Sequence, residues 1–206
     1  MSFTFIIGAL VAYLLGSIPS GLWIGQTFFQ KDIREFGSGN LGSTNAFRVL
    51  GPKAGSVVLF CDVFKGSLAT ILAMTVFQQP SISPLWIASF AVIGHTFPLF
   101  ASFKGGKAVA TFAGMILAYQ PLLLLYGLII FLVLLAITRM VSLTAMVTIS
   151  LGVLLSLLFN DWVLTAFTLA IDIFIIYRHR ANIQRILNGT ENKVPMPWDK
   201  KNKDTK

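Results

Sequence analysis

The sequence predicts an all-α integral membrane protein with seven transmembrane helices, its N-terminus outside the cell and its C-terminus in the cytoplasm. Hydrophobic residues make up 55% of the 206-residue chain and charged residues only 12%. The mean hydropathy is +0.78, and the apolar residues gather in long runs. A soluble domain carries roughly 25% charged residues, so the composition indicates a chain that is embedded in a bilayer.

The apolar runs give the expected helices in order. A bilayer core of about 30 Å needs about 20 apolar residues per helix. The fourth run is short for a crossing, and only Gln120 and Pro121 separate it from the fifth, so six or five spans are alternatives to seven. The seven runs lie near residues 3–24, 54–77, 84–102, 108–119, 121–137, 141–159 and 162–177.

The basic residues favour seven spans. Of sixteen Lys and Arg, four lie between 31 and 53, two at 104 and 107, one at 139 and eight from 178 onward. The intervening connections contain none, and only Lys65 lies inside a run. Merging the fourth and fifth runs would put Lys104 and Arg139 on opposite sides of the membrane. The positive-inside rule therefore places all these loops and the C-terminal tail in the cytoplasm.

We expect a single domain over residues 1–194, followed by a basic tail at 195–206, and a monomeric protein. The formal net charge is +8. In a membrane chain this charge indicates orientation and contact with anionic lipid, so no nucleic-acid partner is expected. The single cysteine, Cys61, excludes an intramolecular disulfide. The first run has no basic residue ahead of it, which is typical of a retained helix rather than a cleaved signal.

The first cytoplasmic loop is unusually rich in small polar residues. Residues 37–51 read "GSGNLGSTNAFRVLG", with four glycines, two serines, a threonine, two asparagines and Arg48. Glycine lacks the Cβ that would keep the backbone N–H groups away from phosphate oxygens, so such a loop can surround an anion closely. A flexible linker is the alternative.

A second loop, in the stretch "GHTFPLFASFKGGKAVAT" at 94–111, has the same character. Gly105 and Gly106 put backbone donors at the start of a helix, where the macrodipole favours anions, and Lys104 and Lys107 add charge. The stretch is not a Walker A loop, because alanines replace that motif's first glycine and its Ser or Thr. Lysines that merely set orientation are the alternative.

Further polar residues fall on the same predicted side. They include Ser142, just after Arg139, and the group His179, Asn182, Arg185 and Glu191. His179 and Asn182 are three residues apart and share one helix face. A histidine at the membrane interface is the alternative reading of His179. The two histidines are far apart and lack carboxylates at ligand spacing, so no metal is expected.

Ionisable residues inside the spans are functional or paired by default. Asp62 and Lys65 are three residues apart, which predicts a mutual ion pair facing the bundle. Asp172 either orients His179 or pairs with a basic residue. We interpret His95 as a hydrogen-bonded structural residue rather than a ligand.

These anion-binding candidates all lie at one predicted membrane face, beside apolar spans that can hold a lipid chain. That arrangement favours an enzyme that joins a soluble phosphorylated molecule to a lipid. A small-anion or lipid-phosphate transporter is the alternative, although transporters more often bind near the midplane between repeated halves, and no repeat is evident. The His-then-Asp pattern of soluble glycerolipid acyltransferases and a nucleophile-elbow sequence are both absent, so no general base is evident.

Four motifs resemble those of the bacterial acyl-phosphate:glycerol-3-phosphate acyltransferases, and the likeness runs from residue 1 to about 194. They are "GSIPSG" at 16–21, "GSGNLGSTNAFRVLG" at 37–51, "GHTFPLFASFKGGKAVAT" at 94–111 and "HRANIQRILNGTE" at 179–191. The resemblance implies transfer of a fatty acyl group from acyl phosphate to the 1-hydroxyl of glycerol 3-phosphate, giving lysophosphatidic acid and phosphate, the first acylation step of bacterial phospholipid synthesis. It also implies seven helices in the bacterial plasma membrane, a cytoplasmic active site, contact with membrane lipid and no cofactor.

The resemblance also implies roles for individual residues. Two positions depart from the family pattern, Ser43 where Ala is usual and Ala108 where Gly is usual, and both are small. Glu191 is implied to hold the site together, and no metal ligand is implied. The catalytic residues implied are Ser38, Arg48 and Lys107, and the substrate-binding residues are Asn40, Thr44, Asn45, Lys104, Gly105, Gly106, Ser142, His179 and Asn182.

The absence of a general base has a physical explanation under this resemblance. Acyl phosphate is a mixed anhydride with a good leaving group, so the enzyme needs mainly to position two anions and neutralise their repulsion. Our hypothesis is that the substrate's own phosphate takes the hydroxyl proton, with Arg48 and Lys107 as clamps.

Overall fold

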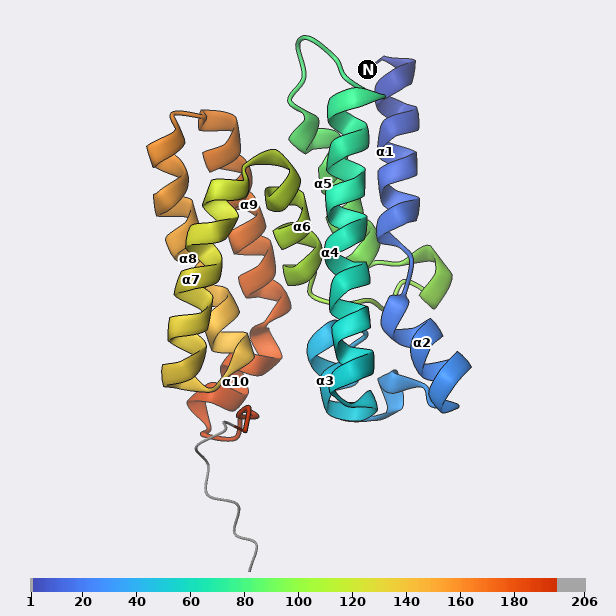
Figure 1. The fold of residues 1–206 in the computed structure, drawn as a ribbon, viewed down its shortest axis with the longest axis vertical. Coiled ribbons are helices and arrows are strands. Elements are labelled where there is room, and N and C mark those ends of the chain that lie inside the picture. Colours follow the sequence, from blue (N-terminus) through green and yellow to red (C-terminus); the bar gives the residue numbers. More distant parts are fainter. Residues whose placement is uncertain (1, 196–206) are drawn as a thin grey trace, which may run out of the picture. The chain divides into compact units, whose positions relative to one another are not determined.

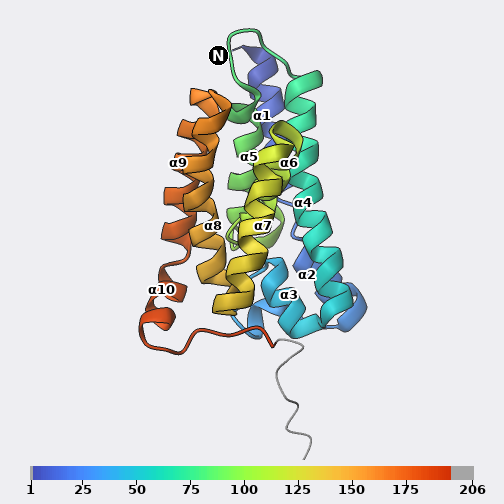
Figure 2. The same ribbon diagram turned by 60° about the vertical axis from the view of Figure 1, so that its left-hand side comes forward.

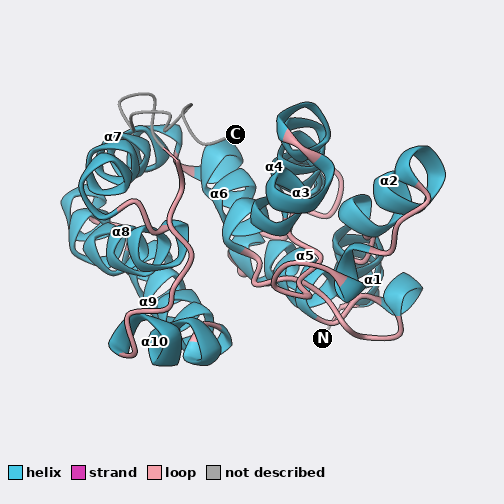
Figure 3. Ribbon diagram, turned by 90° about the horizontal axis from the view of Figure 1, so that it is seen from below, coloured by secondary structure: helices cyan, strands magenta, loops and turns pink. Residues whose placement is uncertain are grey.

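The computed structural model describes residues 2–195, and the regular structure of this part is helical (Figure 3), apart from one isolated β-bridge between Gln79 and Ile82. The all-α prediction is therefore confirmed for the described residues. The elements are α1 (Phe3–Gly16), α2 (Ser20–Phe29), η1 (Ile33–Glu35), α3 (Ser43–Leu50), α4 (Pro52–Thr75), α5 (Pro84–Thr96), η2 (Leu99–Ala101), α6 (Val109–Tyr119), α7 (Pro121–Thr138), α8 (Val141–Ser156), η3 (Leu157–Phe159), α9 (Trp162–Arg178) and α10 (Arg180–Leu187).

All seven predicted runs are helical, but they differ in their capacity to cross a bilayer. Within residues 2–195, five segments are long and apolar enough: Phe3–Phe29, Pro52–Thr75, Pro84–Ala101, Pro121–Thr138 and Val141–Phe159. A sixth is reached if α9 and α10, which meet at a bend of 61°, form one broken span. The multi-pass character is thus established.

Because helix α6 is short, the number of seven spans remains a prediction. The helix has 11 residues, which at 1.5 Å per residue give a length of roughly 16 Å, about half of a bilayer core. Gln120, a residue with a polar side chain and a non-helical backbone, ends it before Pro121 begins α7. The orientation of the two termini is likewise still a prediction.

The chain forms two compact units, divided within α7 between Leu124 and Leu125. Unit 1 contains α1 to α6 and the first residues of α7, and unit 2 contains the rest of α7 with α8, α9 and α10. The single domain expected over residues 1–194 remains a prediction. The expected tail at 195–206 lies outside the described residues except for Pro195.

In unit 1 the long helix α4 is the common neighbour of α1, α3, α5 and α6 (Figure 1). Its contact with α6 is very close, because a Cβ on Gly66 would overlap the Thr111 carbonyl and a Cβ on Gly114 would overlap the Val63 carbonyl. Small residues allow such close packing between helices in lipid, where dispersion contacts replace the hydrophobic effect. Ser67 Oγ adds a 2.8 Å hydrogen bond to the Gly114 carbonyl.

A break between α1 and α2 shapes one end of unit 1. α1 ends at Gly16, and Pro19 precedes α2, since proline cannot continue the hydrogen-bonding ladder of a preceding helix. Figure 2 shows α2 and α3 at the same end of α4, opposite the end that carries the N-terminus. This end holds the loop at 37–51.

In unit 2, α8 packs along α9, and α10 contacts both. The segment after α10 runs back across the end of α8 to the corner between α7 and α8 (Figure 2). There Val194 N donates to the Arg139 carbonyl at 2.7 Å and Arg139 Nε donates to the Val194 carbonyl at 3.2 Å. This paired contact fixes the returning segment.

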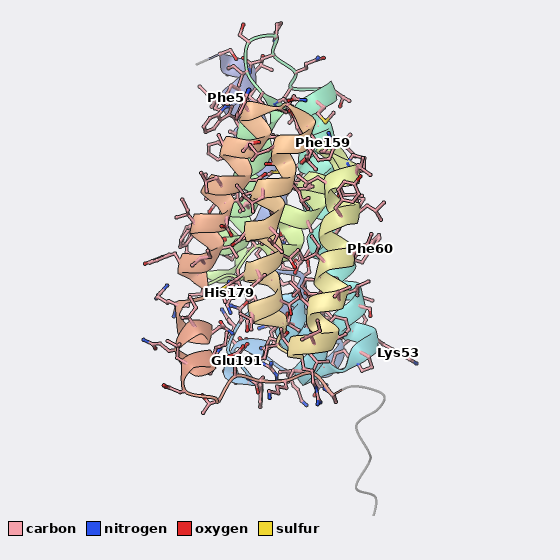
Figure 4. All side chains as sticks on the ribbon, turned by 90° about the vertical axis from the view of Figure 1, so that its left-hand side faces the viewer. Phe5, Lys53, Phe60, Phe159, His179 and Glu191 are labelled. Carbon is pink, nitrogen blue, oxygen red and sulfur yellow. The ribbon has the colours of Figure 1, made fainter. Side chains whose placement is uncertain are left out.

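The outward faces of both units are apolar. Phe60 on α4 is 68% exposed and projects away from the helix (Figure 4), and Ile137 and Ile173 in unit 2 are exposed to a similar extent. Within the described residues of α7 only Leu123 is buried. Faces of this kind suit contact with lipid chains, in agreement with an integral membrane protein.

Candidate active site

Asn45 organises the first polar loop from within. Its side chain is buried, Nδ2 donates to the Ile33 carbonyl at 2.9 Å and to the Phe36 carbonyl at 3.1 Å, and Oδ1 accepts from Ser38 N at 2.8 Å. Both ends of the amide are therefore engaged with the backbone of the loop. Such a fully bonded buried amide fixes a loop firmly, because each bond that it loses leaves a buried polar group unsatisfied.

The other predicted residues of this loop remain accessible. Ser38, Thr44 and Arg48 are exposed, and Asn40 Oδ1 accepts from Gly42 N at 3.0 Å in a local turn. Gly42 caps α3, so the first amides of that helix face the same loop. The structure thus separates residues that can touch an anion from Asn45, which shapes their support.

The glycine loop packs directly on His95. Gly106 N donates to the His95 carbonyl at 3.0 Å. A Cβ on Gly106 would overlap the His95 imidazole, and a Cβ on Gly105 would overlap the His95 and Thr96 carbonyls. Both glycines are therefore required by close approach. Lys107, half-buried, follows directly, whereas Lys104 is exposed.

Ala108 occupies a backbone conformation that favours glycine. Its φ of 61° lies in the left-handed region, where a Cβ costs about 1–2 kcal/mol. The departure from the family pattern at this position therefore has a structural consequence, namely local strain at the start of α6.

The glycine loop lies deep along α4. Thr111, near the start of α6, packs on Gly66 of α4, and Figure 1 shows the loop before α6 partway along α4. The loop is therefore not at the end of α4, where α3 lies. This depth explains why α6 is short.

The predicted ion pair within α4 is confirmed. Lys65 Nζ lies 2.8 Å from Asp62 Oδ1, and both side chains are buried. His95 Nδ1 lies 3.6 Å from the same Asp62 oxygen. His95 accordingly has the structural surroundings that were expected of it.

Glu191 is the centre of the polar cluster in unit 2. Its Oε1 accepts from Ser142 Oγ and from Asn182 Nδ2, each at 2.6 Å, and its Oε2 accepts from Arg185 Nε at 2.7 Å. The Glu191 side chain is only 5% exposed. Residues from α8, α10 and the returning segment are thereby joined through one carboxylate, and Figure 4 shows His179 and Glu191 at the same end of unit 2, opposite Phe159.

The hydrogen bonds hold Glu191 in its charged form. Burial raises the pKa of this carboxyl, but the donors Ser142, Asn182 and Arg185 outweigh burial, so the pKa lies below its ordinary value. The carboxylate is therefore ionised at neutral pH.

His179 is oriented by the backbone. Its Nδ1 lies 2.8 Å from the Ile175 carbonyl, and because a carbonyl can only accept, Nδ1 carries the hydrogen. In the neutral imidazole, Nε2 is then the ring nitrogen with an acceptor lone pair. We expected Asp172 to pair with His179 or with a basic residue. Among the described residues its carboxylate instead accepts from Ser150 Oγ, at 3.0 and 3.1 Å.

Among residues 2–195, no three His, Cys, Asp or Glu side chains lie close enough together to hold a metal ion. The expectation of a metal-free and cofactor-free reaction remains a prediction, which chelation tests.

Comparisons with known proteins identify the family. A family model described as glycerol-3-phosphate acyltransferase matches residues 6–189. The chain belongs to this family. It is accordingly an acyltransferase, as the motifs indicated.

Individual relatives support the same conclusion. A protein named glycerol-3-phosphate acyltransferase from Listeria welshimeri is 55% identical to the chain, over 94% of this chain and 98% of that protein. One of the same name from Enterococcus faecalis is 54% identical, over 90% of this chain and 89% of that protein. A crystal structure of PlsY (YgiH), described as an integral membrane glycerol 3-phosphate acyltransferase in its glycerol 3-phosphate form, matches with a TM-score of 0.87 at 35% identity. It covers 93% of this chain and 96% of that one. The lysophosphatidic acid form of that protein matches with a TM-score of 0.84 at 34% identity, covering 93% and 95%.

The sequence did not reveal how the site residues are supported. Arg185 and Arg139 were noted only as neighbours, yet Arg185 bonds Glu191 and Arg139 fixes the returning segment. The contact of His95 with Gly106 likewise had no local signal. Only the glycine pair, which tolerates close approach, pointed to a neighbour.

Proposed function

We propose that the protein transfers a fatty acyl group from acyl phosphate to the 1-hydroxyl of glycerol 3-phosphate at the cytoplasmic membrane face, giving lysophosphatidic acid and phosphate. The glycerol 3-phosphate and lysophosphatidic acid forms of the structural neighbour support the acceptor and the product. The donor rests on the motif resemblance and on the chemistry of the site.

One observation carries the proposal: unit 1 holds two firm loops, each combining backbone donors with a cation. Asn45 holds the loop of Ser38 and Arg48, and His95 holds the loop of Gly106 and Lys107. Two such loops suit a reaction between two phosphate-bearing substrates, whose mutual repulsion must be neutralised.

The chemistry needs no covalent enzyme intermediate. The 1-hydroxyl oxygen attacks the acyl carbonyl carbon, the bond from that carbon to the phosphate oxygen breaks, and phosphate leaves with the electron pair. The hydroxyl proton passes to a phosphate oxygen of the substrate. Ser38, Arg48 and Lys107 stabilise the charge that develops in the transition state, and Asn40, Thr44, Lys104 and Gly105 complete the phosphate contacts.

Unit 2 is proposed to bind the acceptor. Ser142, His179 and Asn182 are buried, and Glu191 fixes two of them. With hydrogen on Nδ1, His179 Nε2 can accept a hydrogen bond from a glycerol hydroxyl. This arrangement orients the alcohol before attack.

The donor is tested with purified protein in detergent, without a membrane gradient. We expect turnover of acyl phosphate and glycerol 3-phosphate with chelator present, and no turnover with acyl-CoA. Turnover in this setting also rejects the transporter alternative. Efficient use of acyl-CoA, or complete loss of activity in chelator, would show that the stated mechanism is wrong.

The cytoplasmic position of the site is tested by labelling whole cells with a membrane-impermeant thiol reagent. We expect Ser81→Cys, in the connection at 78–83, to react, and Gly39→Cys, in the loop at 37–51, to react only after the membrane is opened. Both start from a Cys61→Ser background. Labelling of Gly39→Cys in intact cells would place the site outside.

A further inference from the structure

We infer that Asp62, Lys65 and His95 act as positioning residues that hold both phosphate-binding loops of unit 1 in register. We call these three side chains the buried cluster. The inference rests on the proposed function, because it concerns the loops that carry Arg48 and Lys107. None of the three residues belongs to the substrate-contacting set described above.

The buried cluster is a continuous group of ionisable side chains inside the helical part of unit 1. Asp62, Lys65 and His95 are 1%, 4% and 7% exposed. Asp62 Oδ1 contacts both Lys65 Nζ, at 2.8 Å, and His95 Nδ1, at 3.6 Å. One carboxylate oxygen of α4 therefore contacts a side chain of its own helix and a side chain of α5.

His95 connects the buried cluster to the glycine loop. Its carbonyl accepts from Gly106 N, and its imidazole occupies the space that a Gly106 Cβ would take. The ring therefore contacts Asp62 through Nδ1 and packs against the glycine loop through Gly106. Because Lys107 follows Gly106 directly, a change in the ring is expected to move the Lys107 backbone.

Lys65 and the space around it connect the buried cluster to the first loop. Lys65 Nζ donates to the Ile18 carbonyl at 3.0 Å, at the break between α1 and α2. Leu41, from the first loop, lines a small cavity of about 10 Å³ together with Ile18 and all three cluster residues. A Cβ on Gly21 of α2 would overlap the Leu41 carbonyl, so α2 also supports this loop. Both loops thus lie next to the same group of side chains.

Stability alone does not account for charges at this position. Replacing a buried ion pair with apolar side chains of similar volume is often neutral or stabilising, whereas removing one partner leaves a costly unpaired charge. Inside a bilayer the cost of an unpaired charge is at least as large. An ion pair that serves only the fold could therefore be exchanged for apolar residues, but one that orients His95 could not.

The decisive experiment separates folding from positioning. We would purify the full chain carrying Asp62→Asn, or Asp62→Leu together with Lys65→Met, and measure the melting temperature, kcat and KM for both substrates. We expect the single variant to lose both stability and activity. The double variant should recover the parental melting temperature, yet its kcat/KM should remain on the order of 10²-fold below the parent, the usual consequence of misplacing a reacting group by about 1 Å.

A coupling measurement then tests whether the effect passes through the glycine loop. His95→Phe keeps a ring against Gly106 but removes the nitrogen that contacts Asp62, and we expect it to lower kcat by roughly tenfold or more. In a Lys107→Ala background the same change should cost little further, since residues that act as a unit are non-additive. Thr70→Val serves as the control, because Thr70 is buried on α4 and bonds only its own helix, to the Gly66 carbonyl. It should leave kcat unchanged.

Two outcomes would overturn the inference. Recovery of parental kcat/KM in the double variant would show that the ion pair serves the fold alone. Fully additive effects of His95→Phe and Lys107→Ala would show that His95 does not act through the glycine loop. These failures are distinct from failure of the proposed function, which would appear in the parental protein as no turnover of acyl phosphate. In that case the same variants are compared with the donor that the parent does use.

Discussion

The two units build their polar sites in opposite ways. In unit 1 the residues proposed to contact substrate, such as Ser38 and Arg48, are exposed, and a different residue, Asn45, holds the loop from within. In unit 2 the proposed contact residues Ser142 and Asn182 are themselves buried and bonded to Glu191. Function and support are thus divided among residues in unit 1 and combined in unit 2, so mutations should separate activity from stability only in unit 1.

The largest effect is expected at Arg48. Arg48→Lys keeps the charge but loses the paired donors of the guanidinium, which lysine cannot reproduce at a phosphate. We expect kcat/KM to fall on the order of 10²-fold with the melting temperature unchanged, as for a lost transition-state contact. Steady-state kinetics and thermal unfolding of the purified protein measure both quantities.

A matched control exists in unit 2. Arg180 is exposed and lies over the Tyr177 ring, so Arg180→Lys keeps a surface cation and should change kcat/KM by less than about twofold. If well-folded Arg48→Lys kept near-parental kinetics, Arg48 would be only an orientation signal. The exposed residues of unit 1 would then not be shown to carry the activity.

The next largest effect is expected at Glu191. Glu191→Gln preserves shape but removes the charge that accepts from Ser142, Asn182 and Arg185, and a hydrogen bond to a charged group is worth about 1.5–3 kcal/mol. We therefore expect a lower melting temperature together with a loss of roughly tenfold in kcat/KM. Glu35→Gln, at an exposed acid of unit 1, is the control. Loss of activity with no loss of stability would mean that unit 2 is organised like unit 1.

A smaller effect concerns pH. The pKa of Glu191 is lower in the folded protein than its ordinary value of 4.5, so its stabilising contribution is complete above that value and is lost as the pH falls through the folded pKa. The difference in melting temperature between parent and Glu191→Gln should therefore shrink below about pH 4.5. Arg34 lowers the pKa of Asp32 in unit 1 with the same sign, but that pair is partly exposed and should contribute less. A difference that is constant down to pH 3 would contradict this assignment.

The smallest effect is expected at Ala108. Ala108→Gly relieves a left-handed backbone, worth about 1–2 kcal/mol, but gives the unfolded chain more freedom, worth about 0.4–1 kcal/mol. A net gain of roughly 0.5 kcal/mol should raise the melting temperature slightly, with kcat/KM changed less than about twofold. Ala110→Gly, within α6, is the control and should destabilise the helix. A loss of stability in Ala108→Gly would show that the strain is absent.

Much of the fold could be predicted because its causes are local. Apolar runs long enough for a bilayer form helices, and the seven runs are helical in the structure. The Asp62–Lys65 pair could also be predicted, since a separation of three residues on a helix brings the side chains together. The motifs placed both polar loops and the group around His179 at the ends of helices, where the structure has them.

The amino-acid sequence was therefore sufficient to predict the helices, the loops that carry polar residues and the family. The packing of the helices was needed to show that Asn45 bonds the Ile33 and Phe36 carbonyls, that the glycine loop packs on His95, and that α6 packs on Gly66 partway along α4. The two kinds of feature differ in how far apart in the sequence the interacting residues lie. Apolar periodicity and glycine content act within a few residues, whereas a buried donor selects its acceptor among groups that only packing between helices brings within 3 Å.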